Sequence, residues 1–125
     1  QGERDFSFEF CFGDKKEILD TASRIAQHFN VQPMVLSFYP TGIGALPEAP
    51  IGISDNEIIN ITAFKKSEIG NDYIIRLFNP TEEKQTGTLS FKGNKIDVEF
   101  GAFEIKTFKC NDSKITETQL LEDII

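Results

Sequence analysis

The chain has 125 residues, enough for about one domain around a single hydrophobic core. Hydrophobic residues make up 39% and charged residues 26%, which argues against both a disordered chain and a membrane protein. The net charge of −7 repels a phosphate backbone, so we expect no nucleic-acid partner. No apolar run reaches the roughly 18 to 20 residues of a membrane span, and the first residues are too polar for a signal peptide.

Residue types that build metal sites and recognition surfaces are scarce. Cys11 and Cys110 are too few for a disulfide framework, and we expect both to be reduced. His28 is the only histidine, so no cluster has the spacing of a zinc site. Twelve Phe stand against two Tyr and no Trp, and Phe buries well but has no polar group to offer a ligand. This composition favours a core over a recognition surface.

The first 30 residues predict a strand followed by a helix. Residues 5–13 alternate strictly between apolar and polar, which places Phe6, Phe8, Phe10 and Phe12 on one face of a strand. Asp14 is a suitable N-cap for a helix that ends near Asn30. Apolar residues spaced three and four apart predict that this helix lies with one face on a sheet: Ile18, Ala22, Ile25, Ala26 and Phe29.

Two segments without helical periodicity come next. Residues 33–39, from Pro33 to Tyr39, are a continuous run of residue types that favour a β-strand. Residues 40–52 are punctuated by Pro and Gly among apolar side chains, and we interpret them as a linker that packs against another surface.

From residue 57 onward the pattern is a series of short strands. Strands are predicted over 57–68, 73–79, 86–92, 95–100 and 103–110, separated by turns at 69–72, 80–83 and 93–94. In the first of them Ile59, Ile61 and Ala63 share a face. The tail over 115–125 is apolar enough to dock, in a conformation that the sequence leaves open. The fold class expected is mainly β, an antiparallel β-sandwich with one short α-helix near the N-terminus.

Acidic side chains offer the first candidates for chemistry. A glycosidase needs two carboxylates about 5 to 9.5 Å apart across a sugar. The candidates fall in a predicted turn and in the tail: Glu82, Glu83, Glu117, Glu122 and Asp123. Nothing in the sequence pairs any two of them in a pocket, so solvated surface charge is the preferred interpretation.

Three other patterns have equally plain interpretations. His28 lies at the end of the predicted helix, where helix capping or exposure is favoured over catalysis. Gly42-Ile43-Gly44 lacks the strand-to-helix context and the Lys of a phosphate-binding loop, so we interpret it as a flexible turn. A carbohydrate-binding platform would need an exposed aromatic ring with a polar tip, and only Tyr39 and Tyr73 qualify.

Three stretches carry a resemblance to a known family. They are residues 61–68 (ITAFKKSE), 73–80 (YIIRLFNP) and 101–108 (GAFEIKTF), and in this order they resemble the C-terminal β-sandwich of α-mannosidases in glycoside hydrolase family 38. Residues 6–10, the helix and residues 29–33 resemble the end of that family's central β-domain. We therefore expect one domain over 1–125, with 1–39 as this strand-helix-strand part, 40–52 as linker and 53–125 as sandwich strands and tail.

The resemblance implies a function for a larger parent enzyme. Family members hydrolyse α-mannosides with retention of configuration, in an amino-terminal catalytic domain with a zinc ion and an aspartate nucleophile. None of those motifs occurs here, so the chain is expected to contain no catalytic, cofactor-binding or metal-binding residue and to be inactive alone. It is interpreted as a non-catalytic structural domain; the alternative is an independent carbohydrate-binding or adhesion module. Expected partners are the rest of the parent polypeptide and, through it, mannose-containing glycans, and the expected location is cytoplasmic.

Two finer expectations concern contacts. Arg76 is predicted to hold Glu68 or Glu104 as a cross-strand pair with a structural role. The resemblance also implies that the chain has lost an interface, so we expect an apolar patch around the linker and self-association through it. The residues expected in this patch are Ile43, Leu46, Ile51 and Ile53.

Overall fold

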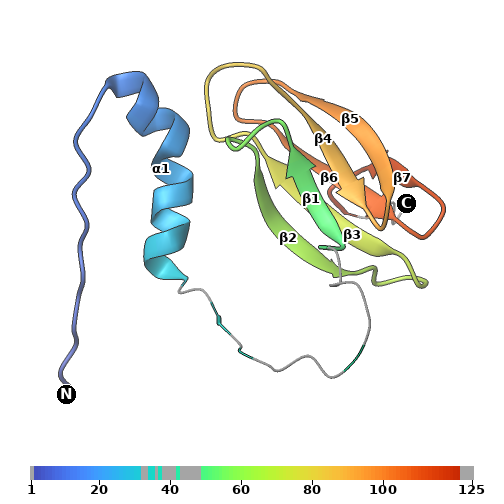
Figure 1. Ribbon diagram of the computed structural model, residues 1–125, viewed down its shortest axis with the longest axis horizontal. Coiled ribbons are helices and arrows are strands. Elements are labelled where there is room, and N and C mark those ends of the chain that lie inside the picture. Colours follow the sequence, from blue (N-terminus) through green and yellow to red (C-terminus); the bar gives the residue numbers. More distant parts are fainter. Residues whose placement is uncertain (1, 32–33, 36, 38–41, 43–48, 122–125) are drawn as a thin grey trace. The chain divides into compact units, whose positions relative to one another are not determined.

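The computed structural model describes residues 2–31, 34–35, 37, 42 and 49–121 (Figure 1). The chain divides into two compact units, 1–36 and 37–125, which are described separately. The first contains the helix and the second contains all the strands found among the described residues. The expectation of one domain over 1–125 stays a prediction.

The helix of the first unit forms where the sequence predicts it. Helix α1 spans Lys15–Asn30, and Asp14 caps it by accepting a hydrogen bond from the backbone N–H of Lys16 at 2.9 Å. Glu17 lies in the first turn and His28 in the last, each at the end where the helix dipole favours its charge. None of the residues of α1 is buried, so the sheet predicted to cover its apolar face is not supplied within this unit.

The strand predicted over 5–13 is wrong. Residues 2–12 have no strand pairing in the structure, and Figure 1 shows them as an irregular ribbon before α1. The side chains of Phe6, Phe8, Phe10 and Phe12 are 75 to 91% exposed. Strict alternation gives a segment an apolar face, but a strand also needs a neighbour for its backbone hydrogen bonds. The described part of this unit contains no such neighbour.

The strand predicted over 33–39 and most of the linker predicted over 40–52 lie outside the described residues. The linker ends earlier than predicted, because strand β1 begins at Ile51. Ile51 and Ile53 pack against the hydrophobic core of the sandwich, so they do not form the exposed patch expected of them. Ile43 and Leu46 lie outside the described residues.

The second unit is an antiparallel β-sandwich, which confirms the predicted fold class (Figure 1). One sheet has the order β1-β4-β5, formed by β1 (Ile51–Ser54), β4 (Gln85–Phe91) and β5 (Asn94–Phe100). The other has the order β2-β3-β6-β7, formed by β2 (Asn60–Lys66), β3 (Tyr73–Phe78), β6 (Ile105–Cys110) and β7 (Ile115–Thr118). All neighbouring strands are antiparallel. The five predicted strands correspond to β2 through β6.

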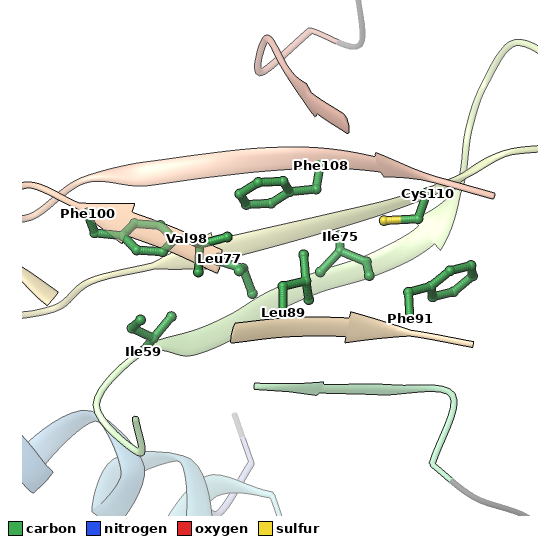
Figure 2. Packing of buried hydrophobic residues seen from close by; sticks show 9 residues of the cluster. All are labelled: Ile59, Ile75, Leu77, Leu89, Phe91, Val98, Phe100, Phe108 and Cys110. Atoms are coloured by element: carbon green, nitrogen blue, oxygen red, sulfur yellow. The ribbon is translucent and has the colours of Figure 1, made fainter. Parts of the chain in front are cut away.

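The core lies between the two sheets and consists of aliphatic and aromatic side chains (Figure 2). Its buried members are Ile59, Ile75, Leu77, Leu89, Phe91, Val98, Phe100, Phe108 and Cys110. They come from alternate positions along the strands, as the pleat of a sheet requires. On β6 the inward residues are Phe108 and Cys110, whereas Ile105 is 52% exposed.

A β-bulge in β2 changes which of its residues face the core. The register shifts between Ile61 and Ala63, and Phe64 then pairs with Ile75 of β3. Phe64 therefore lies on the inward face, with its ring 6.4 Å from that of Phe91. The predicted face of Ile59, Ile61 and Ala63 is interrupted at this point, because one inserted residue reverses the alternation of everything after it.

Candidate functional site

A polar hollow lies at one end of the sandwich. It is a shallow concavity of about 430 Å³ formed by the β2–β3 turn, the β4–β5 turn and the β6–β7 turn. Its lining is Asn71, Asp72, Tyr73, Lys92, Asn111, Asp112, Ser113 and Lys114. Both signs of charge are present, so the hollow has no bias toward an anion or a cation.

The polar groups of this concavity bind mainly to one another. Lys92 Nζ lies 2.8 Å from Asp112 Oδ1, and this hydrogen bond raises the pKa of the Lys92 amine. Asn111 Nδ2 donates to Asp72 Oδ1 at 3.2 Å, while Asn111 Oδ1 accepts from the backbone N–H groups of Ser113 and Lys114. These are the contacts of a turn held by an Asn side chain. The arrangement supports the loop geometry and leaves few groups to bind a ligand.

Tyr73, the predicted carbohydrate platform that the structure describes, does not present an open ring. Its ring stacks on that of Phe64, with centroids 5.5 Å apart and an angle of 17° between the planes. Lys92 Nζ lies over the ring as well, 5.5 Å from its centroid. A pyranose would need a free aromatic face, and here the ring is used for packing. Tyr39 lies outside the described residues.

A second shallow hollow, on the sheet that contains β4 and β5, is acidic. Asp55, Asp97 and Glu99 line it beside Thr88, whose hydroxyl donates to Asp97 Oδ1 at 3.0 Å. Nowhere in the described ranges do three His, Cys, Asp or Glu side chains come close enough together to hold a metal ion. The described residues therefore offer no set of ligands for the zinc ion that the family resemblance implies for the parent enzyme.

A buried network of hydrogen bonds is centred on the amide of Asn79, which is fully buried. Asn79 Nδ2 donates to the carbonyl oxygens of Glu83 and Gly101, both at 2.7 Å. Asn79 Oδ1 accepts from Thr81, at 3.0 Å from the backbone N–H and 2.8 Å from the hydroxyl. The amide thus uses both donors and both acceptor positions. One side chain ties the β3–β4 loop to the β5–β6 loop.

The network extends beyond Asn79 to a third loop. Gln85 Nε2 donates to Thr81 Oγ1 at 3.2 Å, and Asn56 Nδ2 donates to Gln85 Oε1 at 2.9 Å. The backbone N–H of Phe103 donates to the carbonyl of Thr81 at 2.9 Å. No buried side-chain nitrogen or oxygen in the described part of the chain lacks a hydrogen-bond partner. A fully satisfied buried network of this kind fixes one geometry for the loops.

The carboxylates considered for glycosidase chemistry are not brought together where the structure describes them. Glu82 and Glu83 are exposed in the β3–β4 loop. Glu117, on β7, pairs with Lys106 Nζ at 3.3 Å. Glu122 and Asp123 lie outside the described residues.

The predicted pairing of Arg76 with Glu68 or Glu104 is wrong. Arg76 Nη2 donates to the carbonyl of Leu120 at 3.1 Å and Nε to Thr107 Oγ1 at 3.4 Å. Glu68 pairs with Lys65, and Glu104 accepts from the backbone N–H of Gly101. Arg76 pairs in register with Thr107, so its guanidinium reaches across β6 to the chain after β7. Its contacts are structural, with backbone and hydroxyl partners in place of a carboxylate.

The remaining candidates occupy unremarkable positions. His28 is exposed in the last turn of α1, as predicted. The backbone bends at Gly42, whereas Ile43 and Gly44 lie outside the described residues.

The two cysteines are free and differ in environment. Cys11 is exposed in the first unit, and Cys110 is buried in the core of the second. Burial disfavours the thiolate and raises the pKa of Cys110 to about 11, with a further contribution from the negative charge of Asp72. Cys110 behaves as a small core residue, since a thiol with so high a pKa is a poor nucleophile.

Sequence reasoning missed the central role of Asn79. The dipeptide Asn79-Pro80 predicts a turn, and a turn is normally exposed. The sequence signal that points to a buried amide is the short polar run Asn-Pro-Thr directly after β3, a strand with three buried and three half-buried residues. Its partners Glu83 and Gly101 contribute backbone atoms, which sequence patterns do not reveal.

Comparison with known proteins places the second unit in a family. Residues 59–125 match the family model for the glycosyl hydrolases family 38 C-terminal beta sandwich domain. The chain belongs to this family. No curated protein and no solved structure gives a significant match. The resemblance carried by residues 61–68, 73–80 and 101–108 is therefore confirmed, because all three stretches lie inside the match.

The match to the family 38 sandwich begins at residue 59, so it includes β2 to β7 and does not include β1 or the first unit. The resemblance of residues 6–10 and 29–33 to the end of the family's central β-domain stays a prediction. The helices among the described residues include none long and apolar enough to cross a membrane.

Proposed function

We propose that this chain is the non-catalytic, structural C-terminal domain of an α-mannosidase of family 38. The observation that carries the proposal is the match of residues 59–125 to the family's C-terminal β-sandwich. The buried network around Asn79 supports it, because its hydrogen bonds join three loops and none of the buried side-chain nitrogen and oxygen atoms described lacks a partner. A rigid, internally satisfied sandwich is suited to support a neighbouring domain.

Catalysis is assigned to the rest of the parent enzyme. Retaining glycosidases place two carboxyl groups about 5 to 5.5 Å apart, one as nucleophile and one as acid/base. Among the described residues the acidic side chains considered for this role are either exposed in a loop or paired with Lys106. The zinc expected in the parent belongs to its catalytic domain, as the family resemblance implies.

The exposed apolar side chains of the first unit support the proposal that the chain is part of a larger polypeptide. Its four alternating Phe side chains lie in water, at a cost of about 25 cal/mol for each Å² of apolar surface left exposed. The alternation favours a strand in a sheet supplied by the rest of the polypeptide. We therefore propose that polypeptide as the partner, with mannose-containing glycans reached only through it. A cytoplasmic location is part of the same proposal, and the two free cysteines are compatible with it.

The proposal is tested by comparing the chain with its parent. The purified chain should release no mannose from an aryl α-mannoside, with or without added zinc, while the parent enzyme should do so with retention of configuration. Removal of the segment that corresponds to residues 49–125 should lower the thermal stability of the parent and leave its reaction type unchanged. Metal-dependent turnover by the chain alone would contradict the proposal.

A glycan-binding screen of the same preparation addresses the alternative function. Because the ring of Tyr73 is stacked on Phe64, we expect no glycan to bind the chain. Saturable binding of a mannoside would instead favour an independent carbohydrate-binding module.

A further inference from the structure

Phe103 has a backbone conformation that bulky residues rarely adopt. Its φ is +52°, in the left-handed region where glycine and asparagine are the usual residues. A phenylalanine there is strained, because its Cβ approaches the backbone too closely. Such strain persists only where the surrounding structure imposes it, and it is concentrated at sites of function.

The strain at Phe103 is imposed by the loops around it. Its backbone N–H donates to the carbonyl of Thr81 at 2.9 Å. On either side, the carbonyl of Gly101 accepts from Asn79 Nδ2 at 2.7 Å, and the carbonyl of Glu104 accepts from the backbone N–H of Asn79 at 3.0 Å. The turn over 101–104 is thereby held at both ends by one buried residue. The Phe103 ring is presented on a rigid support.

The ring contributes little to the sandwich that holds it. The side chain of Phe103 is 61% exposed and is absent from the core cluster. Ile105, two residues later, is also about half exposed. An aromatic side chain that is exposed to water on a strained, hydrogen-bonded turn has the properties of an interface anchor, since such anchors bury a large ring at little further cost in backbone entropy.

The charge around this anchor limits the kind of partner. Glu82 and Glu83 are exposed on the loop that bonds to Phe103 through Thr81, and Lys84 follows them. The whole chain carries a net charge of −7. A complementary surface would place basic side chains at the rim of an apolar pocket, because opposite charges at a rim steer association and like charges oppose it. The two glutamates of the β3–β4 loop, which is joined to Phe103 through Thr81, also disfavour a second copy of this chain as the partner.

We propose that Phe103, with Ile105 beside it, anchors the sandwich in an apolar pocket bordered by basic side chains in the rest of the parent polypeptide. This inference rests on the proposed function for the identity of the partner. It assigns to the Phe103 ring the contact through which the domain is held. The Asn79 network is then the support that keeps this side chain in position.

The first test measures whether the Phe103 ring stabilises the isolated sandwich. In the isolated chain, Phe103→Asn should leave the unfolding equilibrium constant unchanged or lower it by up to about fivefold, because asparagine tolerates a positive φ. Ile69→Asn is the matched control, since Ile69 is 65% exposed, lies in a turn and does not itself have a positive φ. A rise of more than about threefold for Phe103→Asn relative to this control would show that the ring stabilises the sandwich itself and would overturn the proposal.

The second test looks for the pocket in the full parent polypeptide. Phe103 is replaced by the photocrosslinking residue p-benzoylphenylalanine, and the same replacement at Ile69 serves as the control. We expect irradiation to join position 103 to a segment outside residues 1–125 in at least tenfold higher yield than position 69. Equal yields, or no product from position 103, would overturn the anchor. A strong crosslink in a parent without α-mannosidase activity would refute the proposed function while sustaining the anchor.

Discussion

The Asn79 network predicts that one isosteric substitution will strongly destabilise the sandwich. Asn79→Asp keeps the shape of the side chain and replaces Nδ2, which donates two hydrogen bonds, with an oxygen that faces the carbonyls of Glu83 and Gly101. Two acceptors lose their donor, and a carboxylate is placed where water is excluded. Each lost hydrogen bond costs about 1 kcal/mol, and the carbonyls left unpaired and the buried charge bring the total to about 3–5 kcal/mol.

This magnitude is large compared with the stability of a small domain, which is typically about 5–15 kcal/mol. Urea unfolding followed by circular dichroism should show a lower midpoint with an unchanged slope. The loss should be smaller near pH 4 than at pH 7, because burial raises the pKa of the introduced carboxyl and protonation removes its charge. A protonated acid also regains one donor, so it restores one of the two hydrogen bonds.

Asn71→Asp is the control for this substitution. Asn71 is exposed in the β2–β3 turn, so the same chemical change should alter the free energy of unfolding by less than about 0.5 kcal/mol. If Asn79→Asp behaved like Asn71→Asp at pH 7, the buried amide would not hold the loops together and the reasoning would be refuted.

Four further predictions concern the two cysteines, the close approach of Ile59 to Gly87 of β4, and the helix. Burial raises the pKa of the Cys110 thiol to about 11. The protonated thiol therefore makes its full contribution to stability below pH 9, and this contribution is lost as pH rises toward 11. By pH 10.5 the free energy of unfolding should fall by about 2 kcal/mol more than in Cys110→Ala. In the native chain at pH 8 a thiol reagent should label Cys11 rapidly and Cys110 only on unfolding. Gly87→Val should cost about 1–3 kcal/mol in urea unfolding, because a Cβ there would already lie 3.3 Å from Ile59 Cδ1; an undiminished midpoint would contradict this. Asp14→Ala should reduce the helicity of a peptide spanning residues 5–31, since it removes the N-cap worth about 1 kcal/mol; unchanged circular dichroism would show that the cap is unimportant.

Sequence patterns predicted the sandwich where alternation and turns agree. Strand β5 illustrates this, because Ile96, Val98 and Phe100 face the core as their spacing predicts. The short strands β1 and β7 were missed, since four residues with a Gly or with exposed Thr and Glu give too weak a pattern. The bulge in β2 was missed as well, because an inserted residue has no signature in a stretch of mixed polarity.

Composition limits the available chemistry without any knowledge of the fold, whereas contacts depend on the fold. A single histidine limits metal chemistry whatever the fold, and this limit follows from composition alone. The partners of Arg76 depend on how the chain continues after β7, which no local pattern specifies. The strain at Phe103 likewise depends on two loops that meet only in the folded state.

The strand orders of the two sheets have a consequence for solubility. Each sheet ends in strands that hydrogen-bond on one side only within the sandwich, and such edges can pair with another molecule to form aggregates. β1 and β7 are short, and the bulge in β2 interrupts its hydrogen-bonding ladder. β5 is the longest regular edge, and its outer face carries Lys95, Asp97 and Glu99 in alternate positions. Charge is thus the main protection of this edge, so acid that neutralises its carboxylates should be the condition under which copies of the sandwich begin to join there.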